Sequence, residues 1–279
     1  MTPTPSPIAF IGGGNMAGAI IGGLRRDGWP GERVIVVEPL AESRERLQRD
    51  FGVTCLAAAD AALAAASLVV WAVKPQVFRV AAQAARASLS PDALHLSVAA
   101  GIRMDSIANW LGLDPAQARL VRCMPNTPAL VGRGMTGLFA SPGVDAGDRQ
   151  RVEDVLHATG ELAWLQREDQ LDAVTALSGS GPAYVFFFLE AMVQAGVQMG
   201  LSQAQAHQLA VQTFVGASHL AQDSSESPTV LRERVTSKGG TTHAAICSMQ
   251  ADAVDAAFVK ALKAACDRAR VLGDEFGAQ

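Results

Sequence analysis

The stretch Ile8-Ala9-Phe10-Ile11-Gly12-Gly13-Gly14-Asn15-Met16-Ala17 decides the fold of this chain. A short apolar run ends in glycines and leads into a small-residue helical pattern, so we predict a strand, a tight turn and a helix. The glycines and Ala17 fit the pattern G-x-G-x-x-G/A, in which backbone N–H groups at the start of a helix approach a pyrophosphate. The dinucleotide contacts predicted in this stretch are Ile11, Gly12, Gly13, Gly14, Asn15 and Met16.

A second strand and an acidic residue follow the glycine turn. The run Val34–Val37 is continuous and β-branched, and Glu38 closes it. An acidic side chain roughly 20 residues after the glycines accepts hydrogen bonds from the adenosine ribose, so Glu38 is a predicted cofactor contact. The alternative is an ordinary glycine turn in a parallel-sheet protein, which the order strand, turn, helix, strand and acid disfavours.

Composition indicates a globular protein with a full core. The chain has 279 residues, of which 49% are hydrophobic and 18% are charged, and its net charge is −4. Without a basic block, no nucleic-acid partner is expected. The proline-rich lead Met1–Pro7 has no signal core, and apolar runs such as Tyr184–Leu189 are too short to span a bilayer, so we expect a cytoplasmic protein without membrane contact.

Cysteines and histidines argue against a metal or disulfide framework. The four cysteines are scattered without a C-x-x-C pair, which favours buried reduced thiols. The five histidines show no metal-ligand spacing such as H-E-x-x-H. No metal is therefore expected.

Strand and helix patterns alternate through the first part of the chain and then stop. Continuous apolar runs such as Leu68–Val73 and Leu94–Val98 are typical of buried parallel strands. We predict an α/β fold with a Rossmann-type, doubly wound sheet over residues 1–165. Over residues 166–279 no convincing strand remains, and helices are predicted after Pro182 and Ser202, so the second domain is expected to be helical.

Two further turns follow buried strands. In open α/β sheets ligands lie outside the carboxyl ends of the strands, so both turns are predicted to line the cofactor path. Lys74, in the first of them, is either a cofactor contact or a solvated turn residue, and both interpretations stay open. The residues are Ala72, Val73, Lys74 and Pro75 in the first turn, and Ala99, Ala100 and Gly101 in the second.

Three polar, conformationally restricted segments lie further along the chain. Ser178–Pro182 and Thr236–Thr242 are rich in glycine and hydroxyls and lead into helices, where free N–H groups can hold a carboxylate. Each alone could be only a capped helix start, but together they indicate a small acidic substrate. In Met124–Pro128 two prolines stiffen the backbone around Asn126, either to line a cleft or as a rigid connector.

The helix expected after Pro182 is apolar nearly all round. Most of its circumference is covered by Phe186, Phe187, Phe188, Leu189 and Met192. Such a helix is buried on several sides, which in a small domain indicates cover by a partner chain. An internal core helix is the alternative.

Taken together, the motifs resemble those of the pyrroline-5-carboxylate reductase family. They run in family order over nearly the whole chain, and the last is the family's signature region. One departure is Lys238, where the family usually has proline; it adds a charge and puts substrate affinity in question more than activity. The matching segments are Phe10–Met16, Ala72–Pro75, Ala99–Gly101, Met124–Ala129, Leu177–Tyr184 and Val235–Thr242.

The resemblance implies an activity and the residues that carry it. The family reduces 1-pyrroline-5-carboxylate to L-proline with NADPH or NADH, in the last step of proline synthesis. Hydride passes from nicotinamide C4 to the imine carbon, and a protonated imine is electrophilic enough to need no dedicated acid. By position, Thr242 is the implied catalytic residue, bonded to the imine nitrogen. The implied substrate contacts are Ser178, Gly179, Ser237, Gly239, Gly240 and Thr241.

The resemblance also implies an assembly and raises the question of cofactor choice. Family members form homodimers through interleaved helical domains, often assembled into decamers, so the C-terminal domain is an expected dimerisation domain. The family often prefers NADPH, whereas the charge of Glu38 repels a 2′-phosphate, which Arg44 or Arg46 could offset. We predict that both cofactors work and that Glu38 shifts the preference toward NADH.

Two other function classes stay open at this point. A hydroxyacid or phosphogluconate-type dehydrogenase also joins a dinucleotide domain to a helical one, but it relies on a catalytic lysine there, and Lys238, Lys260 and Lys263 do not sit in that setting. A protein that only senses dinucleotides would not need the intact Ser178–Pro182 and Ser237–Thr242 segments.

Overall fold

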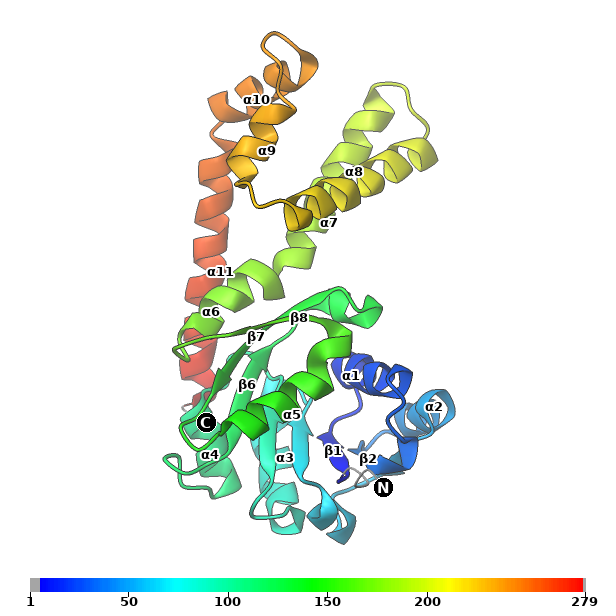
Figure 1. Ribbon diagram of the computed structural model, residues 1–279, viewed down its shortest axis with the longest axis vertical. Coiled ribbons are helices and arrows are strands. Elements are labelled where there is room, and N and C mark those ends of the chain that lie inside the picture. The colour runs from blue at the N-terminus through cyan, green and yellow to red at the C-terminus, as the bar shows by residue number, and fades with distance from the viewer. Residues whose placement is uncertain (1–5, 278–279) are drawn as a thin grey trace. The chain divides into compact units, whose positions relative to one another are not determined.

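The computed structural model describes residues 6–277, so the first part of the proline-rich lead lies outside the described residues. The chain divides into two compact units (Figure 1). The first extends to Ser180 and includes the chain from Ala265 onward, and the second is Gly181–Ala264. This division differs from the predicted one, residues 1–165 and 166–279, because a short helix after residue 165 and the end of the last helix pack in the first unit.

An eight-stranded sheet forms the centre of the first unit, in the order β3-β2-β1-β4-β5-β6-β7-β8. β7 runs antiparallel to β6, and all other neighbouring strands are parallel. The predicted α/β class is therefore confirmed, with a mixed sheet in which β7 and β8 both run opposite to the other six strands, a reversal that the sequence did not predict. The strands are β1 (Ile8–Ile11), β2 (Val34–Val37), β3 (Thr54–Leu56), β4 (Leu68–Trp71), β5 (Leu94–Ser97), β6 (Leu120–Met124), β7 (Gly134–Ala140) and β8 (Gly160–Trp164).

Helices cover both faces of the sheet and give it two apolar cores. Side chains alternate along each strand, so Ile8 and Phe10 face one core while Ala9 and Ile11 face the other. The first core takes residues of α1, α2 and α5, and the second takes residues of α3 and α4 together with Phe276. The helices of this unit are α1 (Asn15–Arg26), α2 (Ala41–Phe51), α3 (Pro75–Ala85), α4 (Met104–Leu111), α5 (Ala146–Leu156) and α6 (Gln170–Val174).

Helices make up the second unit, as the sequence predicts. Ser202 caps α8 through a capping box with Gln205, which confirms the predicted helix start. Inside the unit, the rings of Tyr184 and Phe188 pack edge-on against Phe258. The helices are α7 (Gly181–Gln198), α8 (Gln203–Asp223), α9 (Pro228–Arg234), α10 (Thr241–Ala251) and the first part of α11 (Val254–Gly277).

The helix expected after Pro182 is longer than the sequence pattern indicates. α6, a π-helical segment and α7 form one helix from Gln170 to Gln198, long and apolar enough to cross a membrane by length and composition alone. The expectation that the apolar runs are too short to span a bilayer counted only the aromatic stretch. Alanine, glycine and methionine extend the apolar helix beyond that stretch. Phe186 and Phe187 are 59% and 67% exposed in this chain, so much of the apolar surface is left without cover.

All four cysteines are free, as expected. Cys123 is buried, and burial raises the pKa of its thiol to about 12. The expectation of burial is wrong for Cys247, which lies exposed on α10, while Cys55 and Cys266 are partly buried. Among the described residues no group of three His, Cys, Asp or Glu side chains could hold a metal ion.

We predict that His95 makes the first unit sensitive to acid. The imidazole is buried in β5 and its Nδ1 accepts from Trp71 Nε1 at 3.2 Å, while burial lowers its pKa from 6.5 to about 4. Between pH 6.5 and 4 the imidazole is therefore protonated in the unfolded chain but neutral in the folded chain. The contribution of His95 to the free energy of unfolding is complete above pH 6.5 and falls as the pH drops toward 4. The loss from this group is about 3 kcal/mol.

Urea unfolding at pH 7, 5.5 and 4.5 measures this loss. His95→Gln keeps an acceptor for Trp71 without titrating, so the acid-dependent loss should shrink. His219→Gln, on the exposed surface of α8, is the control and should leave the pH dependence as in the wild type. An unchanged pH dependence in the His95 variant would contradict the assignment.

Candidate functional site

The glycine turn after β1 approaches a neighbouring strand too closely for any side chain. Gly12 has φ +100°, and a Cβ there would lie 2.6 Å from the carbonyl oxygen of Ala72. Gly14 precedes α1 as its N-cap without a side-chain capping bond, and a Cβ on it would meet nothing within 4 Å. The turn thus leaves the first N–H groups of α1 uncapped beside open space, which suits a pyrophosphate.

The sheet register brings the other predicted cofactor turns to the same edge. Ile11 pairs with Trp71, and Trp71 pairs with Ser97, so the segments that follow these three strands lie side by side. The N–H of Ala72 donates to the carbonyl of Ile11 at 2.8 Å, continuing the ladder into the turn. Residues 72–75 therefore stand next to the glycine turn, and residues 99–101 stand beside residues 72–75, at the edge where open α/β sheets bind ligands.

Lys74 and Pro75 form the start of α3. Pro75 takes the first helical position, where its missing N–H costs nothing, and Lys74 is the N-cap residue. The Lys74 side chain is exposed at this edge of the sheet. Its position is consistent with both interpretations from the sequence, which stay open.

Glu38 lies against the glycine turn. Its Oε2 accepts from the N–H of Gly13 at 2.9 Å, and its Oε1 accepts from the N–H of Leu40 at 3.0 Å. On the other side, Arg46 Nη2 donates to the carbonyl of Gly13 at 3.3 Å. Both backbone polar groups of Gly13 are therefore hydrogen-bonded to side chains, and each carboxylate oxygen keeps acceptor capacity for a further donor such as a ribose hydroxyl.

Two arginines beside Glu38 bring positive charge to this part of the turn. Arg44 Nη1 donates to the carbonyls of Glu38 at 2.8 Å and Pro39 at 2.7 Å, and Arg46 reaches Gly13. Charge-assisted bonds of this kind hold both guanidinium groups close to the backbone. An anion at this place would meet one carboxylate and two guanidinium groups.

The stiff loop after β6 connects to the predicted Ser178 segment. Asn126 is buried; its Nδ2 donates to the carbonyl of Ser178 at 3.0 Å and its Oδ1 accepts from the N–H of Met135 at 2.9 Å. A Cβ on Gly179 would lie 2.5 Å from Met124 Cε, so the loop packs closely on this segment. The two prolines therefore hold Asn126 as a structural bridge, which favours the connector interpretation.

Ser178 and Gly179 do not begin a helix, which corrects the reason for their prediction. They end a π-helical segment, Thr175–Gly179, that continues α6, and the N–H of Ser180 donates to the carbonyl of Thr175 at 2.8 Å. The five-residue α6 was not predicted. Because it precedes the Ser178–Pro182 segment, its helical carbonyls accept from N–H groups that were expected from the sequence to be free for a ligand. π-helical turns are frequent at functional sites, and the substrate role of Ser178 and Gly179 remains a prediction.

In the second unit, the signature segment forms a tight turn at the start of α10. The N–H of Gly240 donates to the carbonyl of Ser237 at 3.0 Å, and Gly239 has φ +76°, which favours glycine. Gly240 is the N-cap and makes no side-chain capping bond, so the N–H groups of Thr241 and Thr242 have no side-chain cap. The turn thus gathers the predicted residues of this segment at one exposed helix start.

His243 and Lys238 lie beside this turn. The His243 ring is 3.8 Å from Cys247 Sγ, one turn further along α10, and its exposed position agrees with a solvated imidazole. Lys238 is exposed at the tip of the turn.

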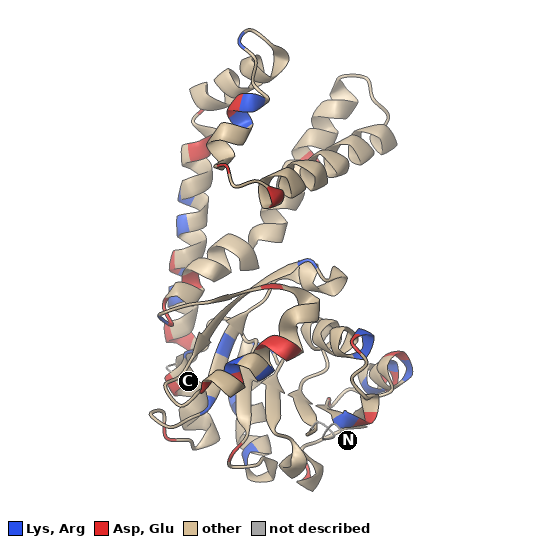
Figure 2. Cartoon of the chain, in the orientation of Figure 1, with Lys and Arg blue, Asp and Glu red and all other residues tan. Residues whose placement is uncertain are grey.

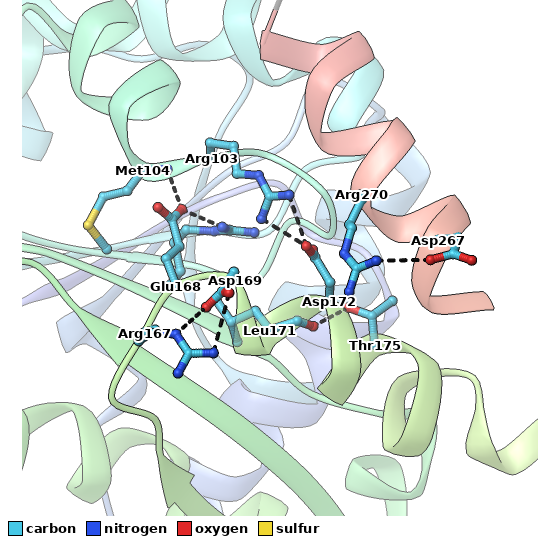
Figure 3. Close-up of polar contacts among 11 residues, drawn as sticks. Arg103, Met104, Arg167, Glu168, Asp169, Leu171, Asp172, Thr175, Asp267 and Arg270 are labelled. Atoms are coloured by element: carbon cyan, nitrogen blue, oxygen red, sulfur yellow. Dashed lines mark hydrogen bonds and ion pairs between the residues drawn. The ribbon is translucent and has the colours of Figure 1, made fainter. Parts of the chain in front are cut away.

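A partly buried ion-pair network is the main feature of the first unit that sequence patterns missed (Figure 3). Arg103 pairs with Asp172, and Arg122, which is 4% exposed, pairs with Glu168. Burial lowers the pKa of Arg122 although Glu168 opposes the shift. The one signal in the sequence is Arg122 itself, a charge inside the apolar strand β6, which requires a buried partner.

The fold and the two turns define a class of protein: a dinucleotide-dependent oxidoreductase in which a mixed α/β sheet unit is joined to a helical unit. Comparisons with known families agree with this class. A family described as "NADP oxidoreductase coenzyme F420-dependent" matches residues 7–101, and one described as "Pyrroline-5-carboxylate reductase dimerisation" matches residues 168–272.

Individual relatives narrow the class. The chain is 45% identical to a pyrroline-5-carboxylate reductase of Pseudomonas aeruginosa, over 97% of this chain and 98% of that protein. A solved pyrroline-5-carboxylate reductase of Coxiella burnetii superposes with a TM-score of 0.88 at 38% identity, covering 96% of this chain and 98% of that one. A Plasmodium falciparum pyrroline carboxylate reductase, solved with NADP bound, gives a TM-score of 0.84 at 26% identity and covers 97% and 99%.

The chain therefore belongs to the pyrroline-5-carboxylate reductase family. This confirms the resemblance stated from the motifs and, with it, the predicted enzyme class, an NAD(P)H-dependent reductase. Residues 168–272 carry the family's dimerisation region, so a capacity for self-association is part of this chain.

We predict that Gly12→Ala weakens cofactor binding. The added Cβ would meet the Ala72 carbonyl at 2.6 Å in a backbone conformation that L side chains rarely adopt, so the turn must move. Titration of protein fluorescence with NADPH should show affinity reduced by about tenfold or more. The control is Gly18→Ala in α1, where a Cβ meets nothing within 4 Å and affinity should stay within about twofold. Equal affinities for the two variants would contradict the role of the turn.

Proposed function

We propose that the protein reduces 1-pyrroline-5-carboxylate to L-proline with NAD(P)H, as a step of proline biosynthesis. The observation that carries the proposal is the 45% identity over 97% of the chain to the Pseudomonas aeruginosa enzyme, which extends over both the glycine turn and the signature turn. The hydroxyacid dehydrogenase hypothesis loses its basis, because the matched dimerisation family covers the helical half of the chain.

The cofactor end of the site fits a dinucleotide. Gly12 comes close to Ala72, Gly14 faces open space, and the first N–H groups of α1 are uncapped, so the turn has room and donors for a pyrophosphate. The predicted contacts Ile11–Met16, Glu38, residues 72–75 and residues 99–101 would hold it along one edge of the sheet. When bound, the reduced nicotinamide supplies the hydride.

The signature turn supplies the substrate end. Ser237, Gly239, Gly240 and Thr241 would hold the substrate carboxylate, since the exposed start of α10 offers uncapped N–H groups and hydroxyls to an anion. Lys238 adds a positive charge beside them. Ser178 and Gly179 are proposed as further substrate contacts.

Thr242 is proposed to hold the imine nitrogen. Its hydroxyl lies on the first turn of α10, next to the residues proposed for the carboxylate. A hydrogen bond there orients the ring for hydride addition, and the protonated imine is already electrophilic, so orientation is the main contribution of the chain.

We further propose a homodimer formed through the helical half, as the family name of residues 168–272 suggests. Figure 2 shows that α7 and α8 are nearly free of charged residues. Phe186 and Phe187 are exposed on α7, so a second copy of the chain is the proposed cover. The dimerisation domain, predicted over residues 166–279, the decameric assembly and a cytoplasmic location remain proposals of the same kind.

The activity is tested by following nicotinamide absorbance with 1-pyrroline-5-carboxylate and with a panel of hydroxyacids. Oxidation of NADPH with the imine alone is the expected result. Thr242→Ala should lower turnover by about tenfold or more, because one hydrogen bond to the reacting group is lost. Thr242→Ser keeps the hydroxyl and should retain most of the turnover. Unchanged kcat and KM in the alanine variant would remove Thr242 from the mechanism.

Cofactor preference is tested by comparing kcat/KM for NADH and NADPH. We expect both to be used, with Glu38 favouring NADH because its carboxylate accepts from a 2′-OH and repels a 2′-phosphate. Glu38→Gln keeps an acceptor oxygen for the Gly13 N–H, so it removes the charge while leaving that contact available. The ratio of NADPH to NADH efficiency should rise several-fold in this variant, and strong NADPH selectivity of the wild type would refute the argument.

A further inference from the structure

Arg103 stands at the end of the loop that carries the predicted cofactor residues 99–101. It is the N-cap residue of α4, and its side chain points to α6, where its guanidinium meets Asp172 (Figure 3). Arg103 Nη1 donates to Asp172 Oδ1 at 3.2 Å and Nη2 donates to Oδ2 at 2.9 Å, a bidentate pair. Asp172 is 3% exposed, so the contact is largely shielded from water.

The same guanidinium lies against the end of α11. A Cβ on Gly273 would be 2.9, 3.0 and 3.1 Å from Nε, Nη2 and Cζ of Arg103, so only glycine admits the guanidinium at this distance. Nearby, a Cβ on Gly101 would lie 3.4 Å from Leu272 Cβ and from Phe276 Cδ2, at ordinary contact distance. The end of α11 therefore packs on the loop that follows β5.

A second contact fixes the chain just before α6. Glu168 Oε1 accepts from the N–H of Met104 at 2.7 Å and also from Arg122, which is buried in β6. The entry to α6 is thus attached to α4 and to the sheet by backbone and charge together. Arg167 and Asp169, in contrast, form an ion pair in which both side chains are exposed.

α6 and the end of α11 are the two segments through which the chain passes between its compact units. The chain leaves the first unit at Ser180, along the helix that runs from Gln170 to Gln198. It returns at Ala265 within α11, a single helix from Val254 to Gly277. One arginine at the end of the cofactor loop therefore touches both connecting helices.

We propose that Arg103 is a positioning residue for hydride transfer, which holds both connecting helices against the loop of residues 99–101 through Asp172 and Gly273. The inference rests on the proposed function, in which the first unit binds the cofactor and the turn of residues 237–242 binds the substrate. A loosened attachment would let the two connecting helices take a wider range of positions. The cofactor and the substrate would then be aligned for hydride transfer less often. Small losses of alignment lower turnover much more than they lower binding.

Arg103→Lys is the main test variant. It keeps the positive charge for buried Asp172 but lacks the planar fork that makes two bonds and fits over Gly273. Gly273→Ala is the second variant; it leaves both charges in place and pushes the guanidinium aside. The matched controls are Arg167→Lys, in the exposed ion pair near α6, and Gly277→Ala, at the end of the same helix, where a Cβ comes no closer than 3.4 Å to Ser106 Oγ.

Three measurements are made on the full-length protein. We expect Arg103→Lys to lower kcat at saturating 1-pyrroline-5-carboxylate and NADPH by about tenfold, and Gly273→Ala to lower it in the same direction. The dissociation constant for NADPH, from fluorescence titration without substrate, should stay within about twofold because the Gly12–Met16 turn is untouched. Amide hydrogen exchange should quicken over residues 170–180 and 265–277, and both controls should match the wild type.

Several results would overturn the inference. The first is a kcat that stays within twofold of the wild-type value in both test variants, whether or not their amide hydrogen exchange changes. Another is a NADPH affinity that falls in parallel with kcat, which would place Arg103 in cofactor binding. Unchanged exchange in either connecting segment would also refute it. If Arg103→Lys fails to fold, the same three measurements on Gly273→Ala decide. A wild-type protein that does not reduce the imine would refute the proposed function, while the exchange measurement would still test the attachment.

Discussion

The close approach of Gly12 to the carbonyl of Ala72 is the constraint on which the cofactor site depends. β1 pairs with β4 and β4 with β5, so the turns that follow these strands meet at one edge. With no Cβ, Gly12 lets the first turn lie directly on the second, at a distance that any other residue would forbid. The position of α1, and with it the uncapped N–H groups at its start, follows from this contact.

The charged side chains of Glu38 and Arg46 also fix the backbone of the glycine turn. The N–H of Gly13 donates to Glu38 and its carbonyl accepts from Arg46, so residues predicted to lie near the ribose also fix the backbone predicted to face the pyrophosphate. Removing Glu38 would therefore change two things at once: the charge near the ribose and the orientation of a peptide. A conservative change to glutamine separates the two effects, whereas a truncation would mix them.

Local patterns explain which parts of the fold were predictable. Continuous apolar strands, the glycine turn and the Ser202 cap are short-range signals, and the structure confirms them. The five residues of α6 are too few to show a helical period, so the sequence presented Ser178 as the start of a helix when it lies inside one. Arg103 and Asp172 are 69 positions apart, and the sequence around either residue gives no sign of its partner. The candidate site turns could be predicted because each carries its own glycines and hydroxyls. The attachment between segments was missed because it exists only in the folded chain.

The long apolar helix from Gln170 to Gln198 shows why composition alone does not assign an environment. By length and hydropathy it passes for a membrane span. Its first part, however, contains Asp172, buried and paired with Arg103 in the sheet unit, and further along Tyr184 and Phe188 pack on Phe258. A helix anchored by an ion pair at one end and by aromatic contacts on one face has only part of its surface to offer. The remaining exposed surface, with Phe186 and Phe187, still requires an apolar cover. The match of residues 168–272 to a dimerisation family is the independent fact that favours a second copy of the chain as the cover.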